Sequence, residues 1–145
     1  MIEDVLNRGN TMHAYRQVMS NKGSAGIDGM SVAELYGYWT KNRLRIEAEI
    51  REGRYPPKPI LGVEIPKSNG KTRLLGVPTV VDRMLQQAVG QVIAVKFEME
   101  FEDYSYGFRP NRNAQQAVMK AQEYINAGYQ HIVDIDLKNF FDEVD

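Results

Sequence analysis

Apolar residues recur along the chain with two different periods, and these periods predict its secondary structure. Four segments carry apolar residues every three to four positions, so we expect helices over about 10–22, 31–53, 79–99 and 113–128. Segments 60–66 and 71–77 have the composition of strands, and Asn69-Gly70 between them is a common hairpin turn. Near the end of the chain, apolar and acidic residues alternate over 132–137, which is typical of a half-buried strand.

Polar residues at the starts of the predicted helices support these limits. Asn10, Ser31, Thr79 and Asn113 stand where helix caps are expected, and Ser31 with Glu34 has the capping-box spacing. The apolar positions of the second and third helices predict their buried faces: Leu35, Tyr38 and Trp39, then Val81, Met84, Leu85, Ala88, Val89, Val92 and Ile93. The order helix, helix, hairpin, helix, helix, strand indicates an α/β fold in the broad sense of a mixture of helices and strands. Because helices and strands do not alternate regularly, its arrangement is α+β.

The alternating segment 132–137 carries the residues with the clearest chemistry. On a strand, Asp134 and Asp136 would lie on one face about 7 Å apart, with Val133, Ile135 and Leu137 on the other. Two such carboxylates repel each other, and a hard cation such as Mg²⁺ offsets their charge through oxygen ligands. Alternatively, the segment is an exposed edge strand with ordinary acidic residues, and the pattern alone does not decide between the two.

Two further segments combine cations with turns or aromatic rings. Lys67 and Arg73 flank the hairpin tip, where they would clamp a polyphosphate or simply keep a hairpin solvated. In Ser105-Tyr-Gly-Phe-Arg-Pro110, Tyr106 and Phe108 would stack on bases or sugars while Arg109 holds a phosphate. The structural alternative makes Phe108 a core side chain and Arg109 a tie within the loop.

Composition and charge narrow the classes of function. The chain has no cysteine, so disulfides and thiolate metal sites are excluded and we expect a reducing, cytoplasmic location. His13 and His131 are too far apart in sequence to suggest a zinc site, and no apolar run approaches the ~18 residues of a membrane span. Residues 41–83 include ten basic and five acidic residues, whereas residues 101–145 include four basic and eight acidic ones. This distribution suits a phosphate-rich ligand held against a metal site.

Read together, the motifs resemble a known family. Their order is similar to the N-terminal half of the reverse transcriptase domain in group II intron-encoded proteins, also called maturases, over roughly residues 7–145. The matching strings, in chain order, are Gly26-Ile-Asp-Gly29, Tyr55-Pro-Pro57, Ile65-Pro-Lys67, Arg73-Leu-Leu-Gly-Val-Pro78, Asp82-Arg83 with Gln86-Gln87-Ala88, Ser105-Tyr-Gly-Phe-Arg-Pro110 and the Asp136 motif that leads into Phe140-Phe141.

The resemblance implies roles for individual residues. Asp136 would be a ligand of the catalytic Mg²⁺ pair, whereas Asp134 takes no implied role. Among the nucleotide-binding residues, Lys67 and Arg73 would grip the triphosphate, Phe141 matches the aromatic residue beneath the incoming sugar that excludes a 2′-hydroxyl, and the backbone around Leu137 lies where the family's nucleotide phosphates pass.

The resemblance also implies a division of the chain. Residues 1–100 would be fingers, with N-terminal helices, the hairpin 60–77 and the long helix 79–99, and residues 101–145 would be the junction with the first palm strand. The family's Tyr-x-Asp-Asp hairpin, the rest of the palm, the thumb and C-terminal domains are not in this sequence. We therefore interpret the chain as a truncated piece of a longer protein, and expect it to be inactive and to self-associate through uncovered apolar surface.

For the parent protein, the resemblance implies an RNA-directed DNA polymerase of group II intron type. It would add dNTPs to a DNA primer on an RNA template, the intron RNA in particular, and assist intron splicing and mobility, with no membrane partner. One alternative is a non-catalytic RNA-binding module, and another is a bacterial reverse transcriptase of a different type, such as a retron type. A glycosyltransferase would explain Asp134 and Asp136 but neither the hairpin nor the aromatic loop.

Overall fold

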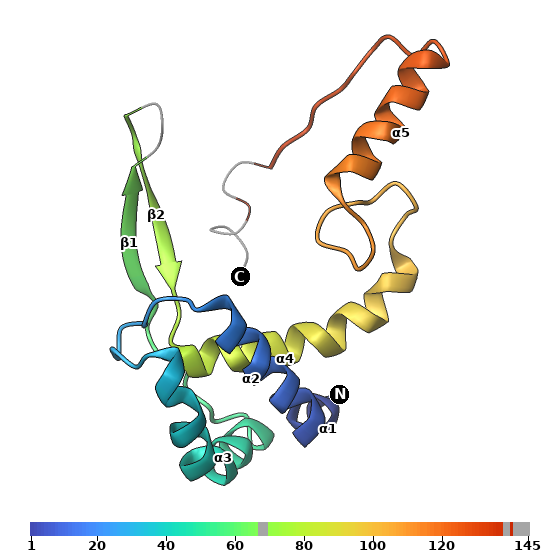
Figure 1. The fold of residues 1–145 in the computed structure, drawn as a ribbon. Helices are drawn as coiled ribbons and strands as arrows, with labels where there is room; N and C mark the ends of the chain where they lie inside the picture. The colour runs from blue at the N-terminus through green and yellow to red at the C-terminus, as the bar shows by residue number, and fades with distance from the viewer. Residues whose placement is uncertain (67–69, 138–139, 141–145) are drawn as a thin grey trace. The chain divides into compact units, whose positions relative to one another are not determined.

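The computed structural model describes residues 1–66, 70–137 and 140, and divides the chain into two compact units, Met1–Glu100 and Phe101–Asp145. Figure 1 shows the order of their helices and strands. The first unit contains α1 (Ile2–Leu6), α2 (Arg8–Asn21), η1 (Val32–Glu34), α3 (Leu35–Arg51), β1 (Leu61–Pro66), β2 (Thr72–Val77), α4 (Val80–Phe97) and η2 (Glu98–Glu100), and the second contains α5 (Ala114–Asn126). The mixture of helices with a small antiparallel sheet confirms the predicted α+β fold class.

The core of the first unit lies between α2, α3 and the first half of α4. Its buried apolar side chains come from each of these helices and from α1: Val5, Leu6, Ala14, Val18, Leu35, Trp39, Ile46, Val80, Val81, Met84, Leu85 and Ala88. The predicted buried face of α4 is confirmed for Val81, Met84, Leu85 and Ala88, and Val92 packs against this core while partly buried. The prediction is wrong for Val89 and Ile93, which are exposed. Helices α1 and α2 both pack against α4, and Asn10 of α2 donates to the Ala88 carbonyl oxygen of α4 at 3.0 Å.

Most helix starts follow their predicted caps. Thr79 accepts a hydrogen bond from the Asp82 amide at 3.2 Å, and Asn113 accepts one from the Gln116 amide at 2.9 Å. The cap of α2 is Asn7 instead of Asn10, because the Asn7 side chain accepts from the Gly9 amide at 2.8 Å and the helix begins two residues earlier than predicted. The short helix α1 before it was not predicted.

The predicted capping box is present at the 3₁₀ turn η1, which leads directly into α3. The Ser31 amide donates to Glu34 Oε2 at 2.9 Å, and the Ser31 hydroxyl lies 2.7 Å from the same oxygen. Leu35 and Trp39 are buried as expected, whereas Tyr38 is 37% exposed. The residues Leu35, Trp39 and Ile46 lie on one stripe of the helix, and Tyr38 lies off that stripe, about 100° round the axis from Trp39.

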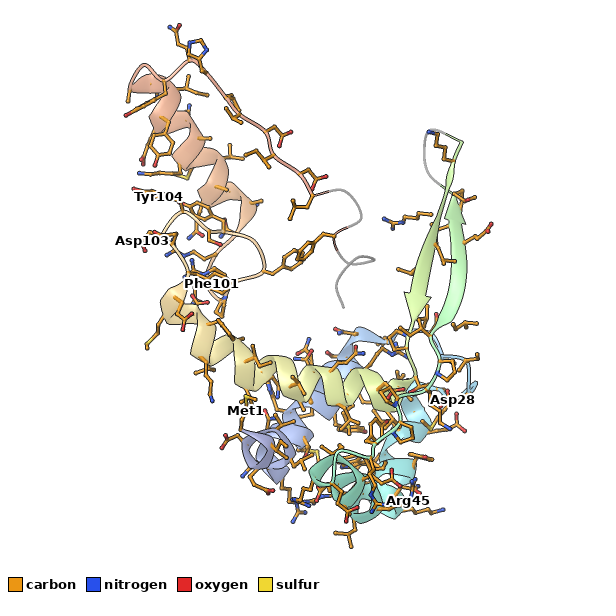
Figure 2. All side chains as sticks on the ribbon, turned by 180° about the vertical axis from the view of Figure 1, so that it is seen from behind. Met1, Asp28, Arg45, Phe101, Asp103 and Tyr104 are labelled. Atoms are coloured by element: carbon orange, nitrogen blue, oxygen red, sulfur yellow. The ribbon has the colours of Figure 1, made fainter. Side chains whose placement is uncertain are left out.

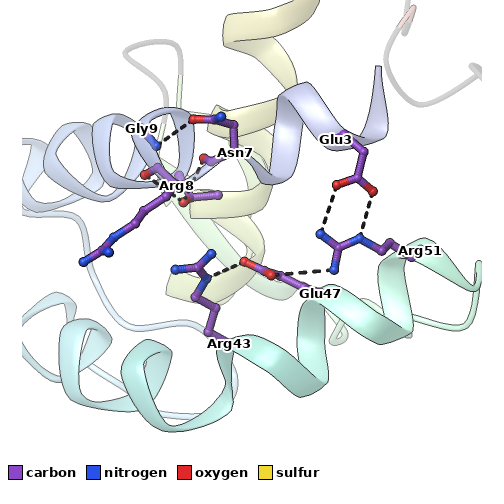
Figure 3. A network of polar contacts seen from close by, with 8 residues as sticks. Glu3, Asn7, Arg8, Gly9, Arg43, Glu47 and Arg51 are labelled. Atoms are coloured by element: carbon purple, nitrogen blue, oxygen red, sulfur yellow. Dashed lines mark hydrogen bonds and ion pairs between the residues drawn. The ribbon is translucent and has the colours of Figure 1, made fainter.

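Ion pairs join α3 to α1 (Figure 3). The Arg51 guanidinium donates to both carboxylate oxygens of Glu3, at 2.8 and 3.1 Å. Glu47, only 4% exposed, accepts from Arg43 Nε at 2.5 Å and lies 3.7 Å from Arg51 Nη1. Because a buried carboxylate without a cation would be costly, these arginines explain how Glu47 remains on the covered face of α3.

The predicted hairpin is confirmed. The strands β1 and β2 pair antiparallel, with Leu61 opposite Val77 at one end and Pro66 opposite Thr72 at the other. Gly70 has a φ of +76°, the left-handed conformation that a turn glycine adopts without strain. Most strand side chains are exposed, and Figure 1 shows the hairpin standing out from the helices of its unit.

The second unit consists of an aromatic loop, α5 and the segment that follows it. The strand predicted over 132–137 is wrong, since the described residues of that segment form no strand and the sheet contains only β1 and β2. A strand needs the hydrogen bonds of a neighbour, and none of the described residues pairs with this one. Its apolar side chains are exposed in consequence: Ile132, Val133, Ile135 and Leu137. No helix among the described residues is long and apolar enough to cross a bilayer.

Candidate functional site

The hairpin carries the cations that the sequence singled out. Arg73 lies on β2 opposite Ile65, one position from the last paired residues at the tip, and its side chain is exposed. Lys67 lies outside the described residues, so the structure does not place it beside Arg73. The described part of the hairpin therefore offers one guanidinium, with five donors in a planar fork, to a phosphate.

The base of the hairpin is held by a buried carboxylate on the first turn of α4. Asp82 is 5% exposed and accepts from the Tyr55 hydroxyl at 2.8 Å, from the Lys58 amide at 3.2 Å and from the Thr79 hydroxyl at 2.6 Å. Burial raises the pKa of Tyr55 above its ordinary value, and the hydrogen bond to Asp82 raises it further. The Tyr55 hydroxyl therefore stays protonated and donates to Asp82 throughout the neutral range.

In the sequence, Asp82 stands out only as part of the Asp82-Arg83 motif, three residues after the predicted cap Thr79, and takes no role from it. Its other two partners are 24 and 27 residues away, at a distance where no local pattern reveals a contact. One indication of the contact was present in the sequence: Tyr55-Pro-Pro57 and Asp82-Arg83 both belong to the motifs that resemble the same family. The structure shows that these two motifs meet.

The loop between α2 and η1 packs against the base of the hairpin, where β2 leads into α4. A Cβ atom at Gly26 would lie 2.7 Å from Thr79 Cα and 2.9 Å from the Pro78 carbonyl oxygen, so only glycine fits this approach of two backbones. Arg83 on α4 donates to the Ser24 carbonyl oxygen. Together these contacts explain why a glycine-rich segment lies against the start of α4. Asp28, labelled in Figure 2, and Lys58 line a hollow of about 110 Å³ beside Thr79.

The aromatic loop of the second unit is organised by its arginines. Arg109 donates to the carbonyl oxygens of Glu102 and Ser105, at 2.7 and 3.0 Å, and its guanidinium lies 5.1 Å from the centre of the Phe101 ring. These contacts favour the interpretation of Arg109 as a tie within the loop. Phe108 is fully exposed with a φ of +55°, so the alternative that made it a core side chain is wrong.

Tyr106 and its neighbours form cation–aromatic pairs on the same loop and on α5. The Arg112 guanidinium lies 5.6 Å from the centre of the Tyr106 ring, which places a cation on one face of that ring. Lys120 Nζ lies 5.5 Å from the ring of Tyr104 and 5.4 Å from that of Tyr124. Tyr104 follows Phe101 and Asp103 along this loop, where Figure 2 labels all three. Sequence reasoning found Tyr106 but missed Tyr104 and Tyr124, which come from different segments.

The acidic segment supplies one candidate metal ligand and no complete metal site. Asp134, Asp136 and Leu137 are exposed, and Phe141 lies outside the described residues. Within the described ranges, no three His, Asp or Glu side chains come together as a metal ion would require. Because Mg²⁺ prefers near-octahedral oxygen coordination, the carboxylate of Asp136 would need further ligands to hold it.

Comparison with known proteins identifies the family. Residues 65–145 match the family described as reverse transcriptase (RNA-dependent DNA polymerase). The chain belongs to the reverse transcriptase family. The match includes Arg73 of the hairpin, the aromatic loop, α5 and the acidic segment.

Similarity to individual proteins extends the match toward the N-terminus. The group II intron-encoded protein LtrA of Lactococcus lactis subsp. cremoris is 34% identical over 133 residues, which covers 91% of this chain and 22% of LtrA. Protein YkfC of Escherichia coli is 34% identical over 137 residues, covering 90% of this chain and 36% of that protein. The putative COX1/OXI3 intron 1 protein of Saccharomyces cerevisiae is 27% identical over 133 residues, covering 92% and 16%.

These similarities confirm the resemblance to group II intron-encoded proteins. They also set its extent, since the chain spans about a third or less of the length of these relatives. What the relatives do as whole proteins therefore enters only as a proposal for this one.

Proposed function

We propose that the complete protein containing this chain is an RNA-directed DNA polymerase of group II intron type. The observation that carries this proposal is the family match over residues 65–145, which takes in both Arg73 on the hairpin and the acidic segment with Asp136. The partners are an RNA template, a DNA primer and a dNTP. The template is intron RNA, and the protein assists splicing and mobility of that intron, as suggested by the similarity to a protein named as group II intron-encoded.

Residues of the hairpin and of the acidic segment bind different parts of the nucleotide. Arg73, with Lys67 nearby in sequence, neutralises the triphosphate, because cationic forks bind phosphate oxygens with charge-assisted hydrogen bonds. The backbone at Leu137 lines the path of the phosphates. The family resemblance gives Phe141 the role of selecting deoxynucleotides, because an aromatic side chain beneath the sugar would exclude a 2′-hydroxyl by its bulk.

Asp136 contributes one carboxylate ligand to Mg²⁺. Bound magnesium would supply charge stabilisation for the primer hydroxyl and for the departing pyrophosphate. Within this chain, the task of Asp136 is to place one carboxylate at the reaction centre, and the remaining ligands come from outside the described residues. The protein works in the cytoplasm, consistent with a chain that contains no cysteine.

The direct test is primer extension by the complete protein with Asp136→Ala. Extension should fall below detection while RNA affinity stays within about twofold, since an isolated carboxylate adds nothing to the attraction of phosphates. Asp134→Ala is the matched control, two residues away on the same segment, and should retain extension. Near-normal extension by Asp136→Ala would show that the acidic segment is not the catalytic motif.

The same assay separates the second candidate function. The ten basic residues between 41 and 83 also suit a non-catalytic RNA-binding module. A wild-type protein that binds RNA tightly in a salt-dependent way but extends no primer with any nucleotide would support that module. Template preference for the cognate intron over unrelated RNA distinguishes the group II type from a retron type.

A further inference from the structure

We propose that Asp82 is a positioning residue that fixes the direction of the hairpin, and thereby the position of Arg73 at the incoming nucleotide. The part that concerns the nucleotide rests on the proposed function. The part that concerns the direction of the hairpin stands on the structure of the first unit alone.

Asp82 binds the two ends of the hairpin at once. The Lys58 amide, just before β1, and the Thr79 hydroxyl, just after β2, both donate to Oδ2, at 3.2 and 2.6 Å. Tyr55, three residues before Lys58, donates to Oδ1 at 2.8 Å. One buried carboxylate on α4 therefore joins the chain entering the hairpin to the chain leaving it, and joins both to the helical core.

The hairpin has little other support among the described residues. Its strands pair with each other, their side chains are mostly exposed, and Leu74 is 74% exposed. A two-stranded hairpin without packing is only marginally stable in water, so its direction depends on how its base is attached. Gly26, which lies against the Thr79 backbone, blocks movement toward one side, and Asp82 supplies the polar attachment.

A small tilt at the base becomes a large displacement near the tip. Arg73 lies six positions before Thr79, which is ~20 Å in an extended strand, so a tilt of ~10° at Thr79 would move Arg73 by ~3.5 Å. Misplacement by ~1 Å of a group that orients a substrate can reduce a rate by ~100-fold. The geometry of the base is therefore sufficient to decide whether Arg73 reaches a phosphate.

Asp82→Asn is the sharpest substitution because it keeps the shape and removes acceptors. Asparagine keeps one acceptor oxygen and replaces the other with a donor, so either the Lys58 amide meets a donor or the Tyr55 hydroxyl has to turn and accept, and in both cases the charge of the carboxylate is lost. Glu47→Gln is the matched control. Glu47 is 4% exposed, close to the 5% of Asp82, and its ion pairs with Arg43 and Arg51 hold α3 without contacting the hairpin.

The first experiment measures the hairpin directly on the 145-residue chain. The chain contains no cysteine, so Leu44→Cys on α3 and Leu74→Cys on β2 give two unique attachment points for nitroxide labels. Both side chains are exposed, by 81% and 74%, so the labels should not disturb the core. Pulsed electron–electron double resonance then measures the distribution of distances between the two labels, and so between the hairpin and α3.

We expect Asp82→Asn to broaden or shift this distribution by ~3 Å, as the lever arm of the strand predicts, and Glu47→Gln to leave it unchanged. An unchanged distribution in Asp82→Asn overturns the inference. If Asp82→Asn does not fold, Tyr55→Phe takes its place, because it removes one hydrogen bond to Asp82 and no charge. A broadened or shifted distance distribution in Tyr55→Phe then supports the inference, and an unchanged one overturns it.

The second experiment measures nucleotide use by the complete protein. Asp82→Asn should raise the KM for dNTP by ~10-fold or more, with a smaller effect on template affinity, because Arg73 contacts the nucleotide and not the duplex. Glu47→Gln should leave that KM within about twofold, since a general loss of stability does not select the nucleotide. Equal KM values in both variants refute the role at the nucleotide. A wild-type protein without extension refutes the proposed function instead, and the distance measurement still decides the role of Asp82 in the hairpin.

Discussion

At the scale of single residues, close contacts between backbone segments decide where this chain requires glycine. Gly26 is the strongest case, because its neighbours are the Thr79 backbone and the Pro78 carbonyl, which cannot move aside without displacing the hairpin and α4. Gly37 on α3 is the opposite case, since a Cβ atom there would meet no atom within 4 Å.

These two glycines give a paired prediction. Gly26→Ala should lower the free energy of unfolding by about 1–3 kcal/mol, the cost of forcing a methyl group into a packed contact. Gly37→Ala should raise it by about 0.5–1 kcal/mol, because alanine in a helix loses less entropy on folding. Urea titration followed by circular dichroism measures both. Equal stability of Gly26→Ala and wild type would contradict the close approach.

The sequence predicted helix caps and core positions better than it predicted hydrogen bonds between residues that are far apart in the chain. Thr79, Asn113 and Ser31 were predicted as caps because a cap acts over three or four residues, within reach of a local pattern. Asn10 was misplaced because Asn7 satisfies the same rule three residues earlier, and the Asn10 side chain instead donates to the Val5 and Ala88 carbonyl oxygens. Ala88 is 78 residues away from Asn10, and no periodicity encodes such a contact.

At the scale of elements, the turn η1 that leads into α3 is capped by a charged residue, Glu34. Hydrogen bonds from the Ser31 side chain and amide hold the pKa of Glu34 below its ordinary value of 4.5. A carboxyl whose pKa is lower in the folded state stabilises that state above its unfolded pKa, and this contribution disappears as the pH falls through the folded pKa. The capping contribution to α3 should therefore be complete at pH 6 and lost on acidification below pH 4.5.

Glu34→Gln tests this pH dependence. Glutamine can still accept from the Ser31 amide but does not titrate, so the difference in melting temperature between wild type and Glu34→Gln should shrink as the pH is lowered from 6 to 3. Thermal melts by circular dichroism at several pH values measure it. Glu64→Gln, an exposed carboxylate on β1 away from any helix start, serves as the control. A difference that is constant with pH would refute the charged cap.

The elements also show where a pattern is insufficient. The hairpin was predicted over 60–77 because Asn69-Gly70 and the flanking prolines indicate a turn and its limits within a few residues. The segment 132–137 has an equally clear alternation, yet no strand forms there among the described residues. Alternation states which face a strand would bury, but only a neighbouring strand supplies the hydrogen bonds, and that neighbour cannot be read from the segment itself.

At the scale of the whole molecule, much apolar surface is exposed on both units. On the first unit it follows the second half of α4 and the turn η2, where Val95 and Met99 are largely exposed. On the second unit it follows α5 and the acidic segment, where Tyr124, Ile125, Tyr129 and Ile132 line a hollow of about 450 Å³. Monomeric proteins rarely leave contiguous apolar surface of this kind in contact with water.

We expect the 145-residue chain to self-associate. Light scattering should give a mass above 16.6 kDa that rises with protein concentration. Val95→Glu places a charge on the exposed part of α4 and should lower the mass if that surface takes part. A mass of 16.6 kDa at every concentration would contradict the expectation.

The attachment of the hairpin also has a consequence for the order of folding. The Thr79 hydroxyl and Asp82 are three residues apart, whereas Lys58 and Tyr55 are 24 and 27 residues from Asp82, and Ser24 is 59 from Arg83. Closing a longer loop costs more chain entropy, so the first turn of α4 should form before the hairpin ends join it, and the glycine loop should dock last. By the same argument, the glycine loop is the part of this junction that opens first when the native chain fluctuates.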